Sequence, residues 1–303
     1  MSGFLVVNAD DLGVSRGATL GILEAHRHGI VTSASLAVTT PGYGHALTEC
    51  VARCPALGVG LHFTLTSGRP VSPCRDVPAL VDEAGFLRWR FLPLLAALAV
   101  PAPGRPEVLA QIELELEAQI QRVLADGVRP DHIDGERHVH LIPGIFEAVI
   151  EAAVRHGIPF VRFGSDIGAR LVRPGHVARL IGSGGFAKSW LLTALTKRDR
   201  RFAHPAVRTA GRFASYLYSG KPGIILERVL TAGPSDGITE IMVHPGVPEE
   251  SRDLALGNRE IERYLASPDR AAELSACLAA RKWATGWRLA TFGQLAAEPG
   301  AAR

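Results

Sequence analysis

Acidic and histidine side chains gather at four places where a short apolar run ends. The runs cover residues 4–7, 58–61, 132–133 and 241–243, and the polar residues at their ends are Asp10 and Asp11, His62, Asp134 to His140, and His244. In α/β barrels and sheets, ligands bind at the carboxyl ends of the strands. We therefore expect these side chains to meet at one end of the fold. Carboxylates and imidazoles together suit Zn²⁺, Mg²⁺, Mn²⁺ or Fe²⁺.

The adjacent pair Asp10 and Asp11 has three interpretations. Two neighbouring carboxylates repel each other unless a cation or a shared proton relieves them, so the pair indicates metal binding or acid–base work. Asp11 can also cap the helix that begins after the turn at residues 12–15. The pair alone does not decide between these roles.

The cluster between Asp134 and His140 carries the densest set of potential metal ligands. If its backbone is extended, the alternate residues share one side of the chain. Two carboxylates and two imidazoles on one face are costly to bury without a metal, although a hydrogen-bonded surface turn is the alternative. His62 is then either a metal ligand or a hydrogen-bonded core histidine. The alternate residues of this cluster are Asp134, Glu136, His138 and His140.

Two further residues are candidates for catalytic work. His244 precedes Pro245, which favours an extended backbone at a strand end, and it suits an acid or an orienting group. Arg162 is the one charge in the apolar run 160–163. If buried, it needs a carboxylate partner, for which Asp10 is the obvious choice; a surface arginine with its charged end in water is the alternative.

The elements that must position these residues alternate between strand and helix. Strands are predicted at 4–7, 33–38, 58–61, 131–134, 160–163, 238–243 and 287–291, and helices at 16–28, 45–54, 107–124, 145–155 and 270–280. Repeated β/α units favour a parallel sheet or closed barrel, here in one domain spanning residues 1–303. Residues 170–230 break the rhythm and are predicted to be a helical insertion in that domain.

Composition excludes several classes of protein. The 303 residues carry a net charge of +3 with basic residues spread along the chain, so we expect no nucleic-acid partner. The chain has no CxxC pair, so its cysteines do not indicate a structural zinc site. The apolar runs at 1–7 and 91–100 are too short for a signal peptide and a membrane span. These observations predict a cytoplasmic protein without a membrane span.

Several motifs, in order, resemble those of the YdjC/ChbG-type carbohydrate deacetylases. They are VNADDLG at 7–13, GIVTSAS at 29–35, GVGLHFTL at 58–65, DHIDG at 131–135 and HP at 244–245. The resemblance covers residues 1–165 well and 236–292 more loosely. It implies an irregular, TIM-like (β/α) barrel that removes the acetyl group from an N-acetylated amino sugar, releasing acetate and a free amine. A homodimer is common in this family.

The resemblance also implies roles for individual residues. Asp10 is expected to be the general base, Asp11 and His62 ligands of a divalent metal, Zn or Mg with Mn or Fe as alternatives, and His244 the group that assists the base or protonates the leaving amine. Many members have a histidine ligand where this chain has Glu136. Either Glu136 or His138 then completes the metal site.

Other functions remain open at this stage. If the substitution at Glu136 has degraded the site, the protein only binds sugar. A metal-dependent isomerase or aldolase on the same barrel would use similar ligands, but such enzymes usually need a lysine or second base near the metal and do not explain Asp10 beside Asp11. Within the insertion, Tyr216 and Tyr218 can either stack on a sugar ring or serve in packing.

Overall fold

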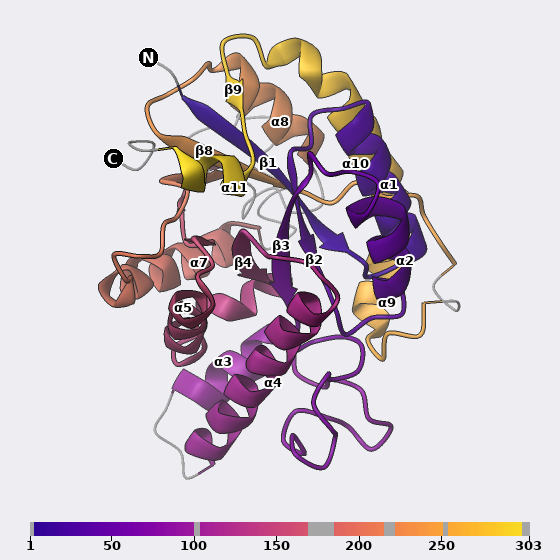
Figure 1. Cartoon of the computed structure of the whole chain (residues 1–303), viewed down its shortest axis with the longest axis vertical. Helices are drawn as coiled ribbons and strands as arrows, with labels where there is room; N and C mark the ends of the chain where they lie inside the picture. The colour runs from indigo at the N-terminus through magenta and orange to yellow at the C-terminus, as the bar shows by residue number, and fades with distance from the viewer. Residues whose placement is uncertain (1–2, 100–103, 169–184, 215–221, 251–253, 299–303) are drawn as a thin grey trace.

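A curled parallel sheet forms the centre of the molecule (Figure 1). The computed structural model describes residues 3–99, 104–168, 185–214, 222–250 and 254–298. Strand order is β5-β4-β3-β2-β1-β8-β7-β6, and β9 pairs with β1. The strands are β1 (Phe4–Leu12), β2 (Ser33–Leu36), β3 (Gly58–Phe63), β4 (His132–Gly135), β5 (Phe160–Val161), β6 (Ser165–Asp166), β7 (Arg212–Ala214), β8 (Ile238–Val243) and β9 (Arg288–Leu289).

The far ends of the sheet are tied together by backbone hydrogen bonds. Arg208, which precedes β7, accepts a bond from the Val161 amide at 3.0 Å and donates one to the Pro159 carbonyl at 2.8 Å. This contact joins the β5 end of the sheet to the β7 end. The predicted irregular (β/α) barrel is confirmed as a barrel-like parallel sheet surrounded by helices.

The helices begin and end at residues that suit those positions. Ser15 caps α1 by accepting a hydrogen bond from the Ala18 amide, and α5 ends at Gly157 with φ of 65°, a left-handed conformation that glycine adopts without strain. The α-helices are α1 (Arg16–Arg27), α2 (Tyr43–Ala46), α3 (Phe91–Ala99), α4 (Arg105–Ala125), α5 (Ile145–His156), α7 (Gly185–Asp199), α8 (Pro222–Thr231), α9 (Arg259–Leu265), α10 (Asp269–Ala280) and α11 (Phe292–Ala297).

The interior of the barrel is divided into an apolar and a polar part. Because strand side chains alternate between two faces, Phe4 and Val6 share a face with Asn8 and Asp10. The first two pack with Phe160, Ile238 and α11 in a small apolar cluster. Above it, buried polar residues fill the barrel: Asn8, Asp10, Ser35, His62, His132, Asp134, Arg162 and Glu240. The sheet therefore carries an apolar base beneath a polar core.

The observed boundaries differ from the predicted ones where polar residues occur. β1 continues through Asp10 and Asp11, and β3 continues through His62, because these side chains find partners inside the barrel. Within 170–230, Arg212–Ala214 forms β7 of the sheet, between β8 and β6. Tyr216 and Tyr218 lie outside the described residues.

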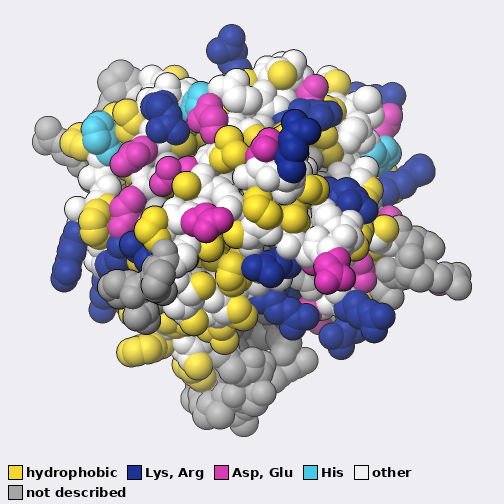
Figure 2. All heavy atoms as spheres, turned by 90° about the horizontal axis from the view of Figure 1, so that it is seen from below, with side chains coloured by type: hydrophobic (Ala, Val, Ile, Leu, Met, Phe, Trp, Pro, Cys, Tyr) yellow, Lys and Arg dark blue, Asp and Glu magenta, His cyan; other side chains and the backbone are white. Residues whose placement is uncertain are grey.

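The surface carries charges of both signs. On the face shown in Figure 2, acidic and basic side chains are interspersed among apolar ones. Among the described residues, no helix has both the length and the apolar character that a membrane crossing requires.

Candidate active site

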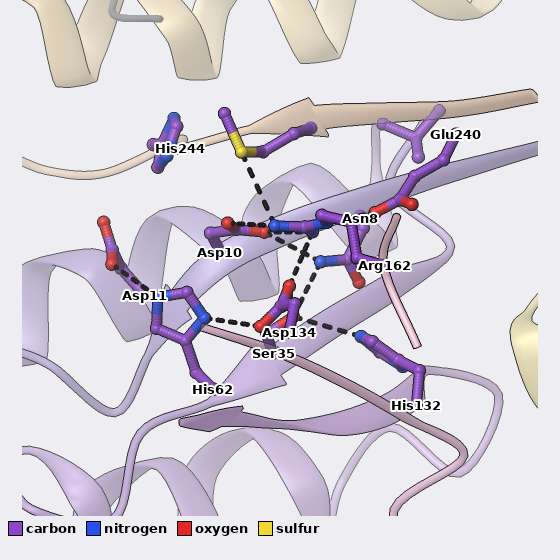
Figure 3. A network of polar contacts seen from close by, with 12 residues as sticks. Asn8, Asp10, Asp11, Ser35, His62, His132, Asp134, Arg162, Glu240 and His244 are labelled. Carbon is purple, nitrogen blue, oxygen red and sulfur yellow. Dashed lines mark hydrogen bonds and ion pairs between the residues drawn. The ribbon is translucent and has the colours of Figure 1, made fainter. Parts of the chain in front are cut away.

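One buried arginine holds three carboxylates together at the centre of the barrel (Figure 3). Arg162 donates to both oxygens of Asp10, each at 2.7 Å, and lies 2.6 Å from Asp134 Oδ2. Its Nε donates to Glu240 at 2.7 Å. Asn8 Nδ2 donates to Asp10 Oδ1 at 2.8 Å. The expected pairing of Arg162 with Asp10 is present, and both side chains are buried.

A bulge in β1 brings both members of the aspartate pair to the site. Neighbouring residues of a regular strand point to opposite faces, so Asp10 and Asp11 would normally separate. The pairing with β2 shifts between Ala9 and Leu12, and Asp11 has a φ of 71°. A non-glycine residue in this left-handed region is strained, and such strain collects at functional sites. Asp11 is part of the strand, so the helix-capping role is not what the structure shows.

His62 lies between two carboxylates from different strands. Its Nδ1 is 2.6 Å from Asp134 Oδ1, and its Nε2 is 3.5 Å from Asp11 Oδ1. Burial opposes protonation, but the charge of Asp134 and the hydrogen bond with Asp11 hold the pKa of His62 well above its ordinary value. Burial also opposes ionisation of Asp11, yet the His62 hydrogen bond and the charge of His244 keep its pKa low. The pair therefore carries opposite charges.

The extended conformation considered for residues 134–140 is wrong beyond Gly135. Residues Glu136–Leu141 form a 3₁₀ turn in which Arg137 and His138 have φ of 53° and 64°. The regular two-residue alternation that would place these side chains on one face is therefore lost. Glu136 accepts hydrogen bonds from Thr66 and Ser67.

Glu136 and His138 have different electrostatic surroundings. Burial raises the pKa of Glu136, while Ser67, Thr66 and the charge of His62 act in the opposite direction. The negative charge of Asp11 also acts on Glu136. Burial, followed by the charge of Lys188, holds the pKa of His138 well below its ordinary value. Of Glu136 and His138, Glu136 is the residue on which the charges of His62 and Asp11 act.

His244 follows β8 and faces the aspartate pair across a small pocket. Asp10, Asp11, His244 and Arg270 are among the residues that line this pocket. Glu273 from α10 accepts a hydrogen bond from the His244 amide at 2.5 Å, and its carboxylate lies 3.6 Å from His244 Nδ1. The Asp10 carboxylate and the His244 imidazole therefore line the same pocket.

Four polar residues of the barrel core are not among those predicted from the sequence to belong to the site. They are Asn8, Ser35, His132 and Glu240, all buried and all joined to the network of Figure 3. The sequence pattern that could have identified them is a polar residue at every second position of a strand. Asn8 and Asp10 form one such pair, and His132 and Asp134 form another.

The sequence is similar to a known family over most of its length. Residues 4–282 match the family model described as YdjC-like protein. The chain is 35% identical over 248 residues to the carbohydrate deacetylase of Brevibacillus brevis, covering 82% of this chain and 83% of that protein. The chain belongs to the YdjC-like protein family. This confirms the family inferred from the motifs.

Other relatives of this YdjC-like chain match it over shorter or more divergent regions. The chitooligosaccharide deacetylase of Proteus mirabilis is 44% identical over 160 residues, which cover 52% of this chain and 58% of that protein. A crystal structure titled a putative cellobiose-phosphate cleavage protein, from Enterococcus faecalis, superposes with a TM-score of 0.66 at 23% identity. The superposition covers 97% of this chain and 99% of the Enterococcus faecalis chain, and it supports the fold.

Proposed function

We propose that this protein is a metal-dependent carbohydrate deacetylase that hydrolyses the N-acetyl group of an amino sugar to acetate and a free amine. The observation that carries the proposal is the arrangement around one pocket of a buried carboxylate, Asp10, and an imidazole, His244, beside the pair Asp11 and His62. Amide hydrolysis needs a base for water and an acid for the leaving amine. The names of the relatives support the same reaction.

The chemistry of the donor set fits a divalent cation held by Asp11, His62 and Glu136. His62 donates from Nδ1 to the Asp134 carboxylate, so its Nε2 can bind a metal once the proton on that nitrogen has been lost. In the described part of the chain, the three residues whose ligand atoms all lie within 4.8 Å of one another are instead Asp10, His62 and Asp134. However, Arg162 already neutralises Asp10 and Asp134, and a second cation there would be repelled. When bound, the metal supplies polarisation of the acetamide carbonyl and activation of water.

Asp10 is suited to accept a proton from the attacking water. Its carboxylate lines the pocket, and Arg162 and Asn8 fix its orientation. Oδ2 accepts one hydrogen bond from Arg162, so a second lone pair on this oxygen is available for a water molecule. The water molecule transfers its proton to Asp10 as its oxygen attacks the carbonyl carbon.

His244 is suited to protonate the leaving nitrogen. Its ring reaches the same pocket, and Glu273 lies close enough to Nδ1 to stabilise the imidazolium. Transfer of the proton allows the carbon–nitrogen bond to break, giving acetate and the free amine. Replacing His244 by Gln should reduce kcat about 100-fold with little change in Zn²⁺ affinity. Steady-state kinetics and calorimetric titration with Zn²⁺ check this, and an unchanged kcat would contradict the assignment.

The direct test of the proposed function is acetate release from a panel of N-acetylated sugars. The panel includes chitobiose and a sugar-lipid, each with Zn²⁺, Mg²⁺, Mn²⁺ or a chelator. Release that needs metal is the expected result. Sugar binding without acetate release under any of these conditions would favour the alternative, a non-catalytic sugar-binding protein.

The third metal ligand is tested by a pair of alanine variants in the same turn. Because the resemblance places a metal ligand at position 136 and the charges of His62 and Asp11 act on Glu136, Glu136→Ala should weaken Zn²⁺ binding by at least about 100-fold. His138→Ala, equally buried two residues away, is the matched control and should change it less than about threefold. Titration calorimetry measures both. A larger loss of Zn²⁺ affinity in His138→Ala than in Glu136→Ala would instead make His138 the third metal ligand.

A further inference from the structure

A chain of polar side chains runs from His62 through the barrel to its other end. The Ser35 hydroxyl lies 2.7 Å from Asp134 Oδ2 and 3.0 Å from His132 Nε2. His132 Nδ1 lies 2.7 Å from Asp131 Oδ1. Figure 3 shows His132, Ser35 and Asp134 directed toward one another. We call Asp131, His132, Ser35 and Asp134 the relay.

The outer end of the relay is anchored at the opposite end of β4. Asp131 precedes β4, and its side chain is 15% exposed in a separate surface pocket. Asp131 Oδ2 accepts a hydrogen bond from the Gly293 amide at 2.8 Å. Ser35 and Asp134, in contrast, are completely buried. The relay therefore connects the surface at one end of the barrel to the base of the candidate active site.

The His132 ring is fixed by its neighbours on both sides. A Cβ atom at Gly60 would overlap the ring, so β3 needs glycine there for the ring to lie against its backbone. The ring of Phe292 packs on it with centroids 4.5 Å apart. This packing holds the His132 ring in place, and the contacts with Asp131 and Ser35 set its orientation.

The hydrogen-bonding capacities give the relay a direction. Asp131 accepts from Nδ1–H of His132, because an ionised carboxylate only accepts. Asn8 Nδ2 donates to the Ser35 oxygen at 2.7 Å, so the single hydroxyl proton of Ser35 has two candidate acceptors, Asp134 and His132. When His132 also carries a proton on Nε2, Ser35 donates to Asp134 and every donor has an acceptor.

We propose that Ser35 and His132 are positioning residues that hold Asp134 in the orientation in which it accepts a hydrogen bond from His62 Nδ1. His62 Nε2 is thereby kept toward Asp11. The Ser–His–Asp order is that of a hydrolase triad, but Ser35 is 0% exposed, so no substrate reaches its hydroxyl. The role in catalysis rests on the proposed deacetylase function, whereas the orientation of His62 can be measured without it.

The test compares Ser35→Ala with Ser33→Ala, a matched control on the same strand. Both serines are completely buried, but the Ser33 hydroxyl has no hydrogen-bond partner within the described part of the chain. Ser35→Ala should weaken Zn²⁺ binding and lower kcat, each about 10-fold, with KM unchanged. It should also shift the NMR signal of the His62 Nδ1 proton and speed its exchange with water. Ser33→Ala should change each value less than about twofold.

A second variant tests the far part of the relay. His132→Phe keeps a ring between Gly60 and Phe292 but removes both nitrogens, and we expect the same direction of change in Zn²⁺ affinity and in the His62 signal. The proposal is overturned if both variants match Ser33→Ala, or if Ser33→Ala changes as much as Ser35→Ala. A protein that releases no acetate refutes the proposed function, and the Zn²⁺ and NMR measurements still decide on the relay.

Discussion

Replacing Asp10 by Asn should lower kcat by about 10²- to 10⁴-fold while one divalent metal remains bound per chain. The amide keeps the size of the side chain and can still accept from Arg162, but it cannot take a proton from water. Metal should remain because the proposed ligands are Asp11, His62 and Glu136. Acetate release measured with saturating Zn²⁺, together with the metal content of the purified variant, checks both parts.

The control for this experiment is Asp76→Asn, which makes the same chemical change at an exposed side chain. It should leave kcat within about twofold, because an exposed charge that does not line the pocket does little to the transition state. Near-normal turnover in Asp10→Asn would refute Asp10 as the base. Loss of the metal in that variant would instead make Asp10 a ligand.

Of the substitutions proposed here, Arg162→Met should cause the largest loss of stability. We expect the free energy of unfolding to fall by about 3–5 kcal/mol at neutral pH. Removing one partner of a buried ion pair leaves uncompensated charge in the interior. Here the guanidinium contacts three buried carboxylates, Asp10, Asp134 and Glu240. Urea denaturation followed by circular dichroism measures the change.

The pH dependence of this loss follows from Asp134. Burial opposes its ionisation, but Arg162 and His62 hold its pKa well below the ordinary value. A carboxyl group with a lowered folded-state pKa stabilises the protein above its unfolded pKa, about 4, and this contribution is lost as the pH falls through the folded pKa. The difference between wild type and Arg162→Met should therefore narrow as the pH falls from neutral to below about 4.

An exposed arginine provides the comparison. Arg155 pairs with Glu117 at 3.3 Å on the surface, and Arg155→Met should change the unfolding free energy by less than about 1 kcal/mol. If the two arginine variants lose equal stability, Arg162 is not the centre of the charged core.

The sequence alone predicted the alternation of strands and helices outside residues 164–230, and the ends of strands at which the site lies; it did not predict β6 and β7. Repeated apolar runs followed by helical periodicity favour a parallel barrel-like sheet, and such sheets bind ligands at their carboxyl ends. Local chemistry also singled out Asp10, Asp11, His62, Arg162 and His244, since charged or polar residues interrupting apolar strands need partners.

Tertiary structure decided which partners these residues have. The bulge that turns Asp11 toward His62 and the left-handed turn at Arg137 and His138 depend on strain that only the surrounding packing can maintain, so a regular extended pattern misplaced the residues after Gly135. The contacts of Arg162 with Asp10 and Glu240 join residues 152 and 78 positions apart in the chain. Sequence patterns fix the face on which a side chain lies, whereas the closure of the sheet determines which faces meet across the barrel.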